Sequence, residues 1–167
     1  FAKAIQHSAM PSVFPPYPGR REFDIHAAMF TAKEVGGDFY DFFFVDDDHL
    51  AIVMSDVSGK GVPAALFMMV SKLALKHRAM QGGTPGEILA DVNQQLCDGN
   101  RQNMFVTTWL GILDIGTSEL VTANAGHEYP AICRENGSFE LFKDRHGFVL
   151  GGMSGSRYKE ETILLQP

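Results

Sequence analysis

The sequence predicts an α+β domain in which antiparallel β-sheets are covered by helices, and three observations support this prediction. Two apolar segments, 39–45 and 50–57, are joined by a short acidic turn and read as a pair of strands. Two consecutive helical segments follow, and further strand-like segments come after them. Strands and helices therefore do not alternate as they would in a parallel βαβ fold, so antiparallel pairing is expected.

The order of elements can be justified along the chain. Residues 1–10 look helical, and 11–19 then contain four prolines and a glycine, which break the helix. We interpret residues 1–20 as a linker helix and an extended lead-in from an upstream regulatory domain, and 21–167 as the main domain. Segment 22–30 has alternating apolar residues and is predicted to be the first strand.

The two helices have different sequence signals. Residues 62–80 are apolar, with Pro63 in the first turn, which predicts a buried helix. In the next helix Thr84, Pro85 and Glu87 form a capping-box pattern, and Gly99 offers a stop. Later strands are predicted within 104–115, 119–126, 130–135, 139–143 and 160–167, with a turn at 136–137.

Composition limits the class of protein. With 167 residues the chain has the length of one domain, and its 45% apolar and 20% charged residues are ordinary for a globular protein. A net charge of −6 argues against nucleic-acid binding. No apolar run is long enough to span a membrane, and Cys97 and Cys133 cannot build a disulfide framework. A cytoplasmic domain is the simplest interpretation, although an upstream domain could tether the whole protein to a membrane.

Asp38 and Asp56 are the candidate site residues that spacing brings together. If the acidic turn is centred on Asp47, paired residue numbers sum to 94, which places Asp38 opposite Asp56 with Cβ atoms roughly 4.5–5.5 Å apart. Facing carboxylates need a cation or a shared proton. Oxygen ligands suit Mg²⁺ or Mn²⁺, and a backbone carbonyl just after Asp56 could be a further ligand.

Two other interpretations of this pair remain open at the level of sequence. Asp38 could cap a strand and Asp56 could begin a turn, with no metal involved. A register slip of one residue would also move one carboxylate to the opposite face of the sheet.

Four motifs together resemble a known family. They are EVGGDFYD (34–41), SDVSGKGVPAAL (55–66), NMFVTTWLGILD (103–114) and ANAGHEYP (123–130). In this order they are similar to the SpoIIE-type (RsbU-like) branch of the PPM metal-dependent protein phosphatases, which are relatives of protein phosphatase 2C. The resemblance extends from residue 5 to the end of the chain.

The resemblance implies a fold, a reaction and a set of ligands. It implies a β-sandwich of two antiparallel sheets flanked by helices, and a serine/threonine phosphatase that uses two Mn²⁺ or Mg²⁺ ions to activate a water molecule. Asp56 would bridge both metals, the Val57 carbonyl would complete one site, and Asp38 would lie beside Asp56 and hold a metal or a metal-bound water. The family also carries aspartates in a C-terminal TDG-type motif, which this chain lacks. We therefore expect an incomplete last part of the fold, weak metal binding and little activity for this chain.

For several other residues near these motifs, a functional interpretation has to be weighed against a structural one. Lys33 could hold a phosphate, but a solvated lysine is the favoured interpretation. Gly37 could allow a substrate to approach, and His127 is a candidate for lining the site, although a loop histidine satisfied by backbone groups is favoured. Asp41 should lie on the opposite face from Asp38 and have a structural role. Residues 46–48 form a solvated acidic turn.

Substrate and partners follow from the resemblance alone. It implies a phosphorylated STAS-type anti-sigma-factor antagonist as substrate and an upstream sensor or receiver domain in the same chain, with a homodimer left open. The competing hypothesis is a non-catalytic phosphoprotein-binding module with the same fold.

Overall fold

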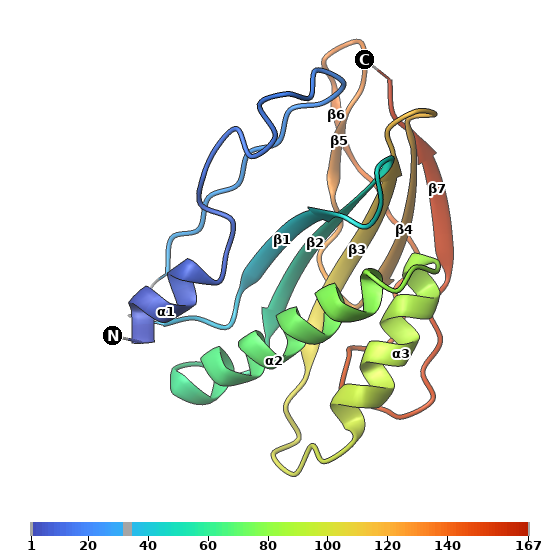
Figure 1. Ribbon diagram of the computed structural model, residues 1–167. Coiled ribbons are helices and arrows are strands. Elements are labelled where there is room, and N and C mark those ends of the chain that lie inside the picture. The colour runs from blue at the N-terminus through green and yellow to red at the C-terminus, as the bar shows by residue number, and fades with distance from the viewer. Residues whose placement is uncertain (1, 32–34, 167) are drawn as a thin grey trace.

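The computed structural model describes residues 2–31 and 35–166, and it is built on two antiparallel sheets. The larger sheet has five strands in the order β1-β2-β3-β4-β7, and β5 pairs with β6 in a two-stranded sheet. The elements are α1 (Ala2–Ser8), β1 (Phe39–Phe44), β2 (His49–Val57), α2 (Val62–Ala79), α3 (Pro85–Cys97), β3 (Val106–Asp114), β4 (Glu119–Ala125), β5 (Ala131–Cys133), β6 (Phe139–Leu141) and β7 (Glu160–Leu164). The predicted α+β class with antiparallel sheets is confirmed (Figure 1).

The β1–β2 hairpin has the predicted register. Phe39 pairs with Ser55 and Phe44 with Leu50, so the paired residue numbers sum to 94 throughout. In the turn, Asp46 Oδ1 accepts hydrogen bonds from the backbone N–H groups of Asp48 and His49, which fixes the length of the connection. The local turn thus sets which residues face each other at the far end of the hairpin.

Helices α2 and α3 cover one face of the five-stranded sheet (Figure 1). The core between these layers is apolar and fully buried, with Met68 and Leu75 from α2 and Ile88, Leu89 and Val92 from α3. The capping box predicted for α3 is present, because the Thr84 side chain accepts from the Glu87 backbone and the Glu87 side chain accepts from the Thr84 backbone. These caps fix where α3 begins.

The opposite face of the sheet has a second apolar core, built around Leu50, Trp109 and Leu120. The N-terminal segment covers part of it through Tyr17 and Phe23, and the β5–β6 region adds Ile132 and Phe142; the other members of this cluster are Leu113, Ile163, Ile25, Phe44, Ile52, Ile115 and Leu165. This face therefore lies between the main sheet and a second, thinner layer.

The strand predicted at residues 22–30 was wrong. This segment is irregular, although its burial still alternates, with Phe23, Ile25, Ala27 and Met29 partly buried and Phe30 96% exposed. Alternation of apolar residues predicts an extended chain with one covered side, but a strand also needs a neighbour for its backbone hydrogen bonds. The segment packs against the sheet through its side chains and forms no ladder within the described residues.

A buried ion pair ties β1 to α2. Asp41 and Lys72 are 3% and 7% exposed, and the Lys72 ammonium group donates to Asp41 Oδ2. Asp41 Oδ1 also accepts from the backbone N–H of Phe42. Asp41 thus points into the helix-covered core, on the face opposite to that of Asp38, and has the structural role expected from its odd spacing.

Replacing Lys72 by methionine should lower the free energy of unfolding by about 3–5 kcal/mol, because the Asp41 carboxylate is then buried without its partner. Adding Asp41→Asn should recover much of this loss, since the amide keeps an acceptor for Phe42 and carries no charge. Urea unfolding measures both, with Lys143→Met on the exposed surface as the control. A double variant no more stable than Lys72→Met alone would contradict this account.

Candidate metal centre

Asp38 and Asp56 lie at the same end of the β1–β2 hairpin. Asp38 immediately precedes β1, and Asp56 is the penultimate residue of β2, so the register continues to place them opposite each other. The pKa of Asp56 is raised to about 6, first by partial burial of its carboxyl group and then by hydrogen bonding with, and repulsion from, Asp38. The register and the effect of Asp38 on the pKa of Asp56 thus agree that the two carboxyl groups are neighbours across the hairpin.

The backbone next to this pair is tightly packed. A Cβ atom added to Gly37 would lie 3.0 Å from both the Cβ atom and the carbonyl oxygen of Val57. Glycine at position 37 thus lets the start of β1 approach the end of β2, at the carbonyl group that the sequence singled out as a ligand. The absence of a side chain at Gly37 therefore makes room for the Val57 carbonyl group beside it.

His127 is also brought to this end of the sheet. Its Nδ1 atom lies 2.8 Å from the Thr107 hydroxyl oxygen, and Thr107 is the β3 residue that pairs with Asp56. Burial lowers the pKa of His127, while the charges of Glu128 and Asp38 act in the opposite direction. Its contact with Thr107 thus places the imidazole at the end of the sheet where Asp56 lies.

Lys33 lies outside the residues that the structure describes, so its predicted role stays a prediction. Thr107 was missed by sequence reasoning, because β2 and β3 are separated by two helices and no short turn fixes their register. Asn124 was missed as well, although it lies in the motif ANAGHEYP that carries part of the family resemblance.

The donor set fits a hard divalent cation in part. Two carboxylates and a backbone carbonyl provide only oxygen ligands, which Mg²⁺ and Mn²⁺ prefer, and the facing carboxylates need a positive charge between them. Within residues 2–31 and 35–166, no group of three or more His, Cys, Asp or Glu side chains is arranged to hold a metal. The pair fits a cation that keeps several waters, rather than an all-protein cage.

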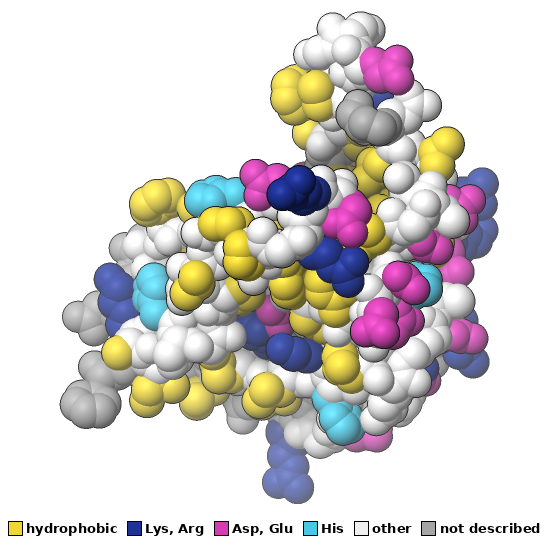
Figure 2. Space-filling model, turned by 45° about the horizontal axis from the view of Figure 1, so that its top comes forward, with side chains coloured by type: hydrophobic (Ala, Val, Ile, Leu, Met, Phe, Trp, Pro, Cys, Tyr) yellow, Lys and Arg dark blue, Asp and Glu magenta, His cyan; other side chains and the backbone are white. Residues whose placement is uncertain are grey.

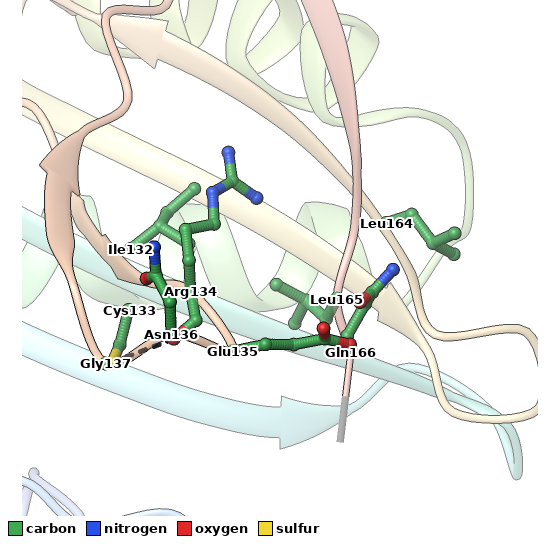
Figure 3. Close-up of a pocket in the computed structure, with 9 residues that line it drawn as sticks. All are labelled: Ile132, Cys133, Arg134, Glu135, Asn136, Gly137, Leu164, Leu165 and Gln166. Carbon is green, nitrogen blue, oxygen red and sulfur yellow. Dashed lines mark hydrogen bonds between the residues drawn. The ribbon is translucent and has the colours of Figure 1, made fainter.

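One sizeable cavity in the described part of the chain lies away from the aspartate pair. It has a volume of about 760 Å³, lies between the β5–β6 hairpin and the end of β7, and is lined by residues 132–137 and 164–166 (Figure 3). Its charged members are Arg134 and Glu135, and Arg134 is already paired with Glu140. On the side of the molecule shown in Figure 2, acidic, basic and apolar side chains are interspersed, in keeping with the modest net charge of −6. The chemistry-bearing residues thus lie at a strand end and not in this cavity.

Comparison with known proteins identifies the family. The family model described as Stage II sporulation protein E (SpoIIE) matches residues 46–167. Protein IcfG of Synechocystis sp. is 32% identical over 90% of this chain and 28% of its own length. Phosphoserine phosphatase RsbU of Bacillus subtilis is 30% identical over 86% of this chain and 42% of its own length. The chain thus spans less than half the length of these relatives.

Solved structures show the same fold. The RsbU and RsbW domains of Rv1364c from Mycobacterium tuberculosis superpose with a TM-score of 0.71 at 29% identity, covering 84% of this chain and 38% of that one. RsbX in complex with magnesium superposes with a TM-score of 0.64 at 17% identity, covering 81% and 63%. The fold is that of the PP2C-like phosphatase class. Within that class, this chain belongs to the SpoIIE family, in its RsbU-like branch.

Gly37→Ala should lower the free energy of unfolding by about 1–3 kcal/mol, because the new methyl group overlaps the Val57 carbonyl and Cβ atom. Gly36→Ala is the matched control, since its Cβ atom would have ordinary contacts, the nearest at 3.4 Å from Thr31 Cγ2. Urea unfolding of both variants measures the difference. Equal losses would show that the close approach of β1 to Val57 is not what requires glycine.

Proposed function

We propose that this chain forms the core of a metal-dependent protein phosphatase that hydrolyses phosphoserine or phosphothreonine. The observation that carries the proposal is the facing pair Asp38 and Asp56, whose mutual repulsion favours a bound cation. The family supports the reaction, because the relative RsbU is named a phosphoserine phosphatase.

Asp38, Asp56 and the Val57 carbonyl are the groups that would hold Mg²⁺ or Mn²⁺, with two ions in the complete centre. When bound, such ions neutralise charge on phosphoryl oxygens and lower the pKa of a water molecule. The related RsbX was solved with magnesium, which supports this class of cation. Two carboxylates and one carbonyl leave half of one octahedral shell to water or to ligands outside the described residues, so we expect weak metal binding and little activity from this chain alone.

The protein groups would divide the remaining work. The aspartates would set the position of positive charge at the strand ends, and Gly37 would keep the Val57 carbonyl in place. His127, kept neutral by burial, would accept a proton from the attacking water. The exposed position of Asp38 and Asp56 suits a phosphorylated side chain presented on another protein.

We further propose that the substrate is a phosphorylated STAS-type anti-sigma-factor antagonist, and that a sensor or receiver domain upstream in the same protein regulates the phosphatase. The supporting observation is that the relatives include RsbU and RsbP, both named phosphoserine phosphatases, and a protein with RsbU and RsbW domains. Among the helices in the described part of the chain, none is both long enough and apolar enough to cross a membrane. We propose a cytoplasmic location for the domain.

A second candidate function is a phosphoprotein-binding module without catalysis. The absence of a three-ligand cluster from the described residues favours this alternative. The same aspartate pair would then hold one cation that bridges to a phosphate, and no phosphate would be released.

Asp38→Asn and Asp56→Asn should each reduce Mn²⁺-dependent phosphate release from a phosphoserine protein by at least about 100-fold, in the whole protein that contains this domain. Neither change should unfold the domain, because each removes a repelling charge. Asp47→Asn, in the exposed turn at the other end of the hairpin, is the control and should retain activity.

Phosphate release by Asp38→Asn at the rate of the Asp47→Asn control would contradict a metal role for the pair. Saturable binding of the phosphoprotein by the wild type, with no phosphate released at any Mn²⁺ concentration, would favour the binding module instead.

A further inference from the structure

We propose that Thr107, Asn124 and Asp144 are positioning residues that hold His127 in one orientation and one tautomer, with the proton on Nδ1 and the lone pair on Nε2. The use of that lone pair in phosphate ester hydrolysis rests on the proposed function, whereas the tautomer itself does not. The inference comes from a chain of hydrogen bonds between β3, β4 and the segment before β7.

The Thr107 hydroxyl decides the tautomer. Its oxygen lies 3.3 Å from the backbone carbonyl oxygen of Asp56 and 2.8 Å from His127 Nδ1. A carbonyl can only accept, so both contacts are hydrogen bonds at the same time only if Thr107 donates its single hydroxyl hydrogen to Asp56. Thr107 must then accept from His127, which requires a hydrogen on Nδ1. Burial lowers the pKa of His127 and favours the neutral ring, so Nε2 has no hydrogen.

Asn124 holds the backbone of the same residue from β4. Its Oδ1 accepts from the N–H of His127 at 2.7 Å, and its Nδ2 donates to the carbonyl of His127 at 3.1 Å. The second Nδ2 hydrogen goes to Asp144 Oδ1 at 2.9 Å. One side chain, 1% exposed, thus satisfies both backbone groups of His127, and a flipped amide would face a donor with a donor.

Asp144 anchors the amide of Asn124. It is 5% exposed, and burial raises its pKa, while Asn124 and His146 act to lower it. Nε2 of His146 lies 3.6 Å from Asp144 Oδ1. Within the described residues, Asp144 Oδ2 and Trp109 Nε1 are buried without a hydrogen bond of good geometry, although the indole is near enough to lower this pKa slightly. Burial of the Asp144 carboxyl group is energetically unfavourable, and the hydrogen bond that it does form is the one from Asn124. We therefore infer that Asp144 serves to orient the Asn124 amide.

The turn before His127 is also restrained. Gly126 has φ of 72°, and a Cβ atom there would lie 3.1 Å from Val149 Cγ1. The backbone N–H of Gly147 donates to the carbonyl of Asn124 at 2.7 Å, which ties the 144–147 segment to β4. His127 is therefore presented by a turn whose backbone is fixed on both sides.

The tautomer suits a proton carrier in ester hydrolysis. When water attacks phosphorus, a P–O bond to water forms, the P–O bond to the seryl oxygen breaks, water loses a proton and the seryl oxygen gains one. An imidazole with a free Nε2 can accept the proton that the attacking water loses, while the seryl oxygen, which leaves on the opposite side of phosphorus, takes its proton from solvent, so the step balances. A ring with its hydrogen on Nε2 could not begin this sequence as an acceptor at that atom.

The test is the tautomer itself, read from long-range ¹H–¹⁵N correlation spectra of the ¹⁵N-histidine-labelled, metal-free chain at about pH 8, above the usual imidazole pKa. The spectrum of His127→Gln assigns the signals of His127 by difference. The wild type should show hydrogen on Nδ1 of His127. Thr107→Ser, which keeps the hydroxyl, should preserve that pattern, and Thr107→Val should shift His127 largely to the form with hydrogen on Nε2.

Asn124→Ala tests the backbone clamp in the same sample type. Amide hydrogen exchange at His127 should become at least about 10-fold faster, because its N–H loses its buried acceptor. In the whole protein, Thr107→Val should lower kcat by roughly 10-fold or more with a smaller effect on KM, in line with the loss of an oriented proton carrier.

Hydrogen on Nε2 of wild-type His127 would overturn the proposal, and so would an unchanged tautomer in folded Thr107→Val. The wild-type spectrum alone distinguishes the two tautomers even if a variant fails to fold. A wild-type Nδ1–H tautomer that depends on Thr107, in a protein that releases no phosphate, would keep the positioning and reject the proposed phosphatase function. Phosphate release by a protein whose wild-type His127 has its hydrogen on Nε2 would support the phosphatase function and reject the positioning role.

Discussion

The close approach of two carboxyl groups across one hairpin is the constraint on which the rest of the site depends. The pKa of Asp56 is raised first by partial burial and then by the hydrogen bond to and the charge of Asp38 opposite it. The repulsion between two facing carboxylates can be offset by a bound cation or by a shared proton. The neighbouring features then make sense together, because Gly37 brings the Val57 carbonyl to the same point and Thr107 and His127 border it.

The packing around β1 and β2 holds the two strands together despite this repulsion. The five-stranded sheet is packed on both faces, so β1 and β2 cannot easily separate to relieve the repulsion. The buried Asp41–Lys72 pair fastens β1 to α2 three residues away from Asp38. Binding energy and folding energy are therefore linked, since a cation that binds only the folded hairpin would stabilise the whole domain.

Features set by residues close together in the sequence could be predicted, whereas contacts between distant segments could not. The acidic turn fixes the β1–β2 register over a few residues, which is why spacing alone placed Asp38 opposite Asp56. The cap of α3 was equally local. Thr107 reaches Asp56 only because β3 pairs with β2 after two intervening helices, and Asp144 reaches Asn124 across the β5–β6 hairpin. The false strand at 22–30 has the same cause, because alternation reports a covered side and not a hydrogen-bonding neighbour.

Anomalous diffraction at the manganese edge, from crystals of this chain soaked in excess Mn²⁺, tests the central claim most directly. The account predicts a peak within about 2.0–2.6 Å of carboxylate oxygens of both Asp38 and Asp56, the coordination distance of hard divalent cations. The same crystals soaked without metal provide the reference for any shift of the two side chains. Saturating Mn²⁺ with peaks only elsewhere, or with none between these carboxylates, would contradict the account.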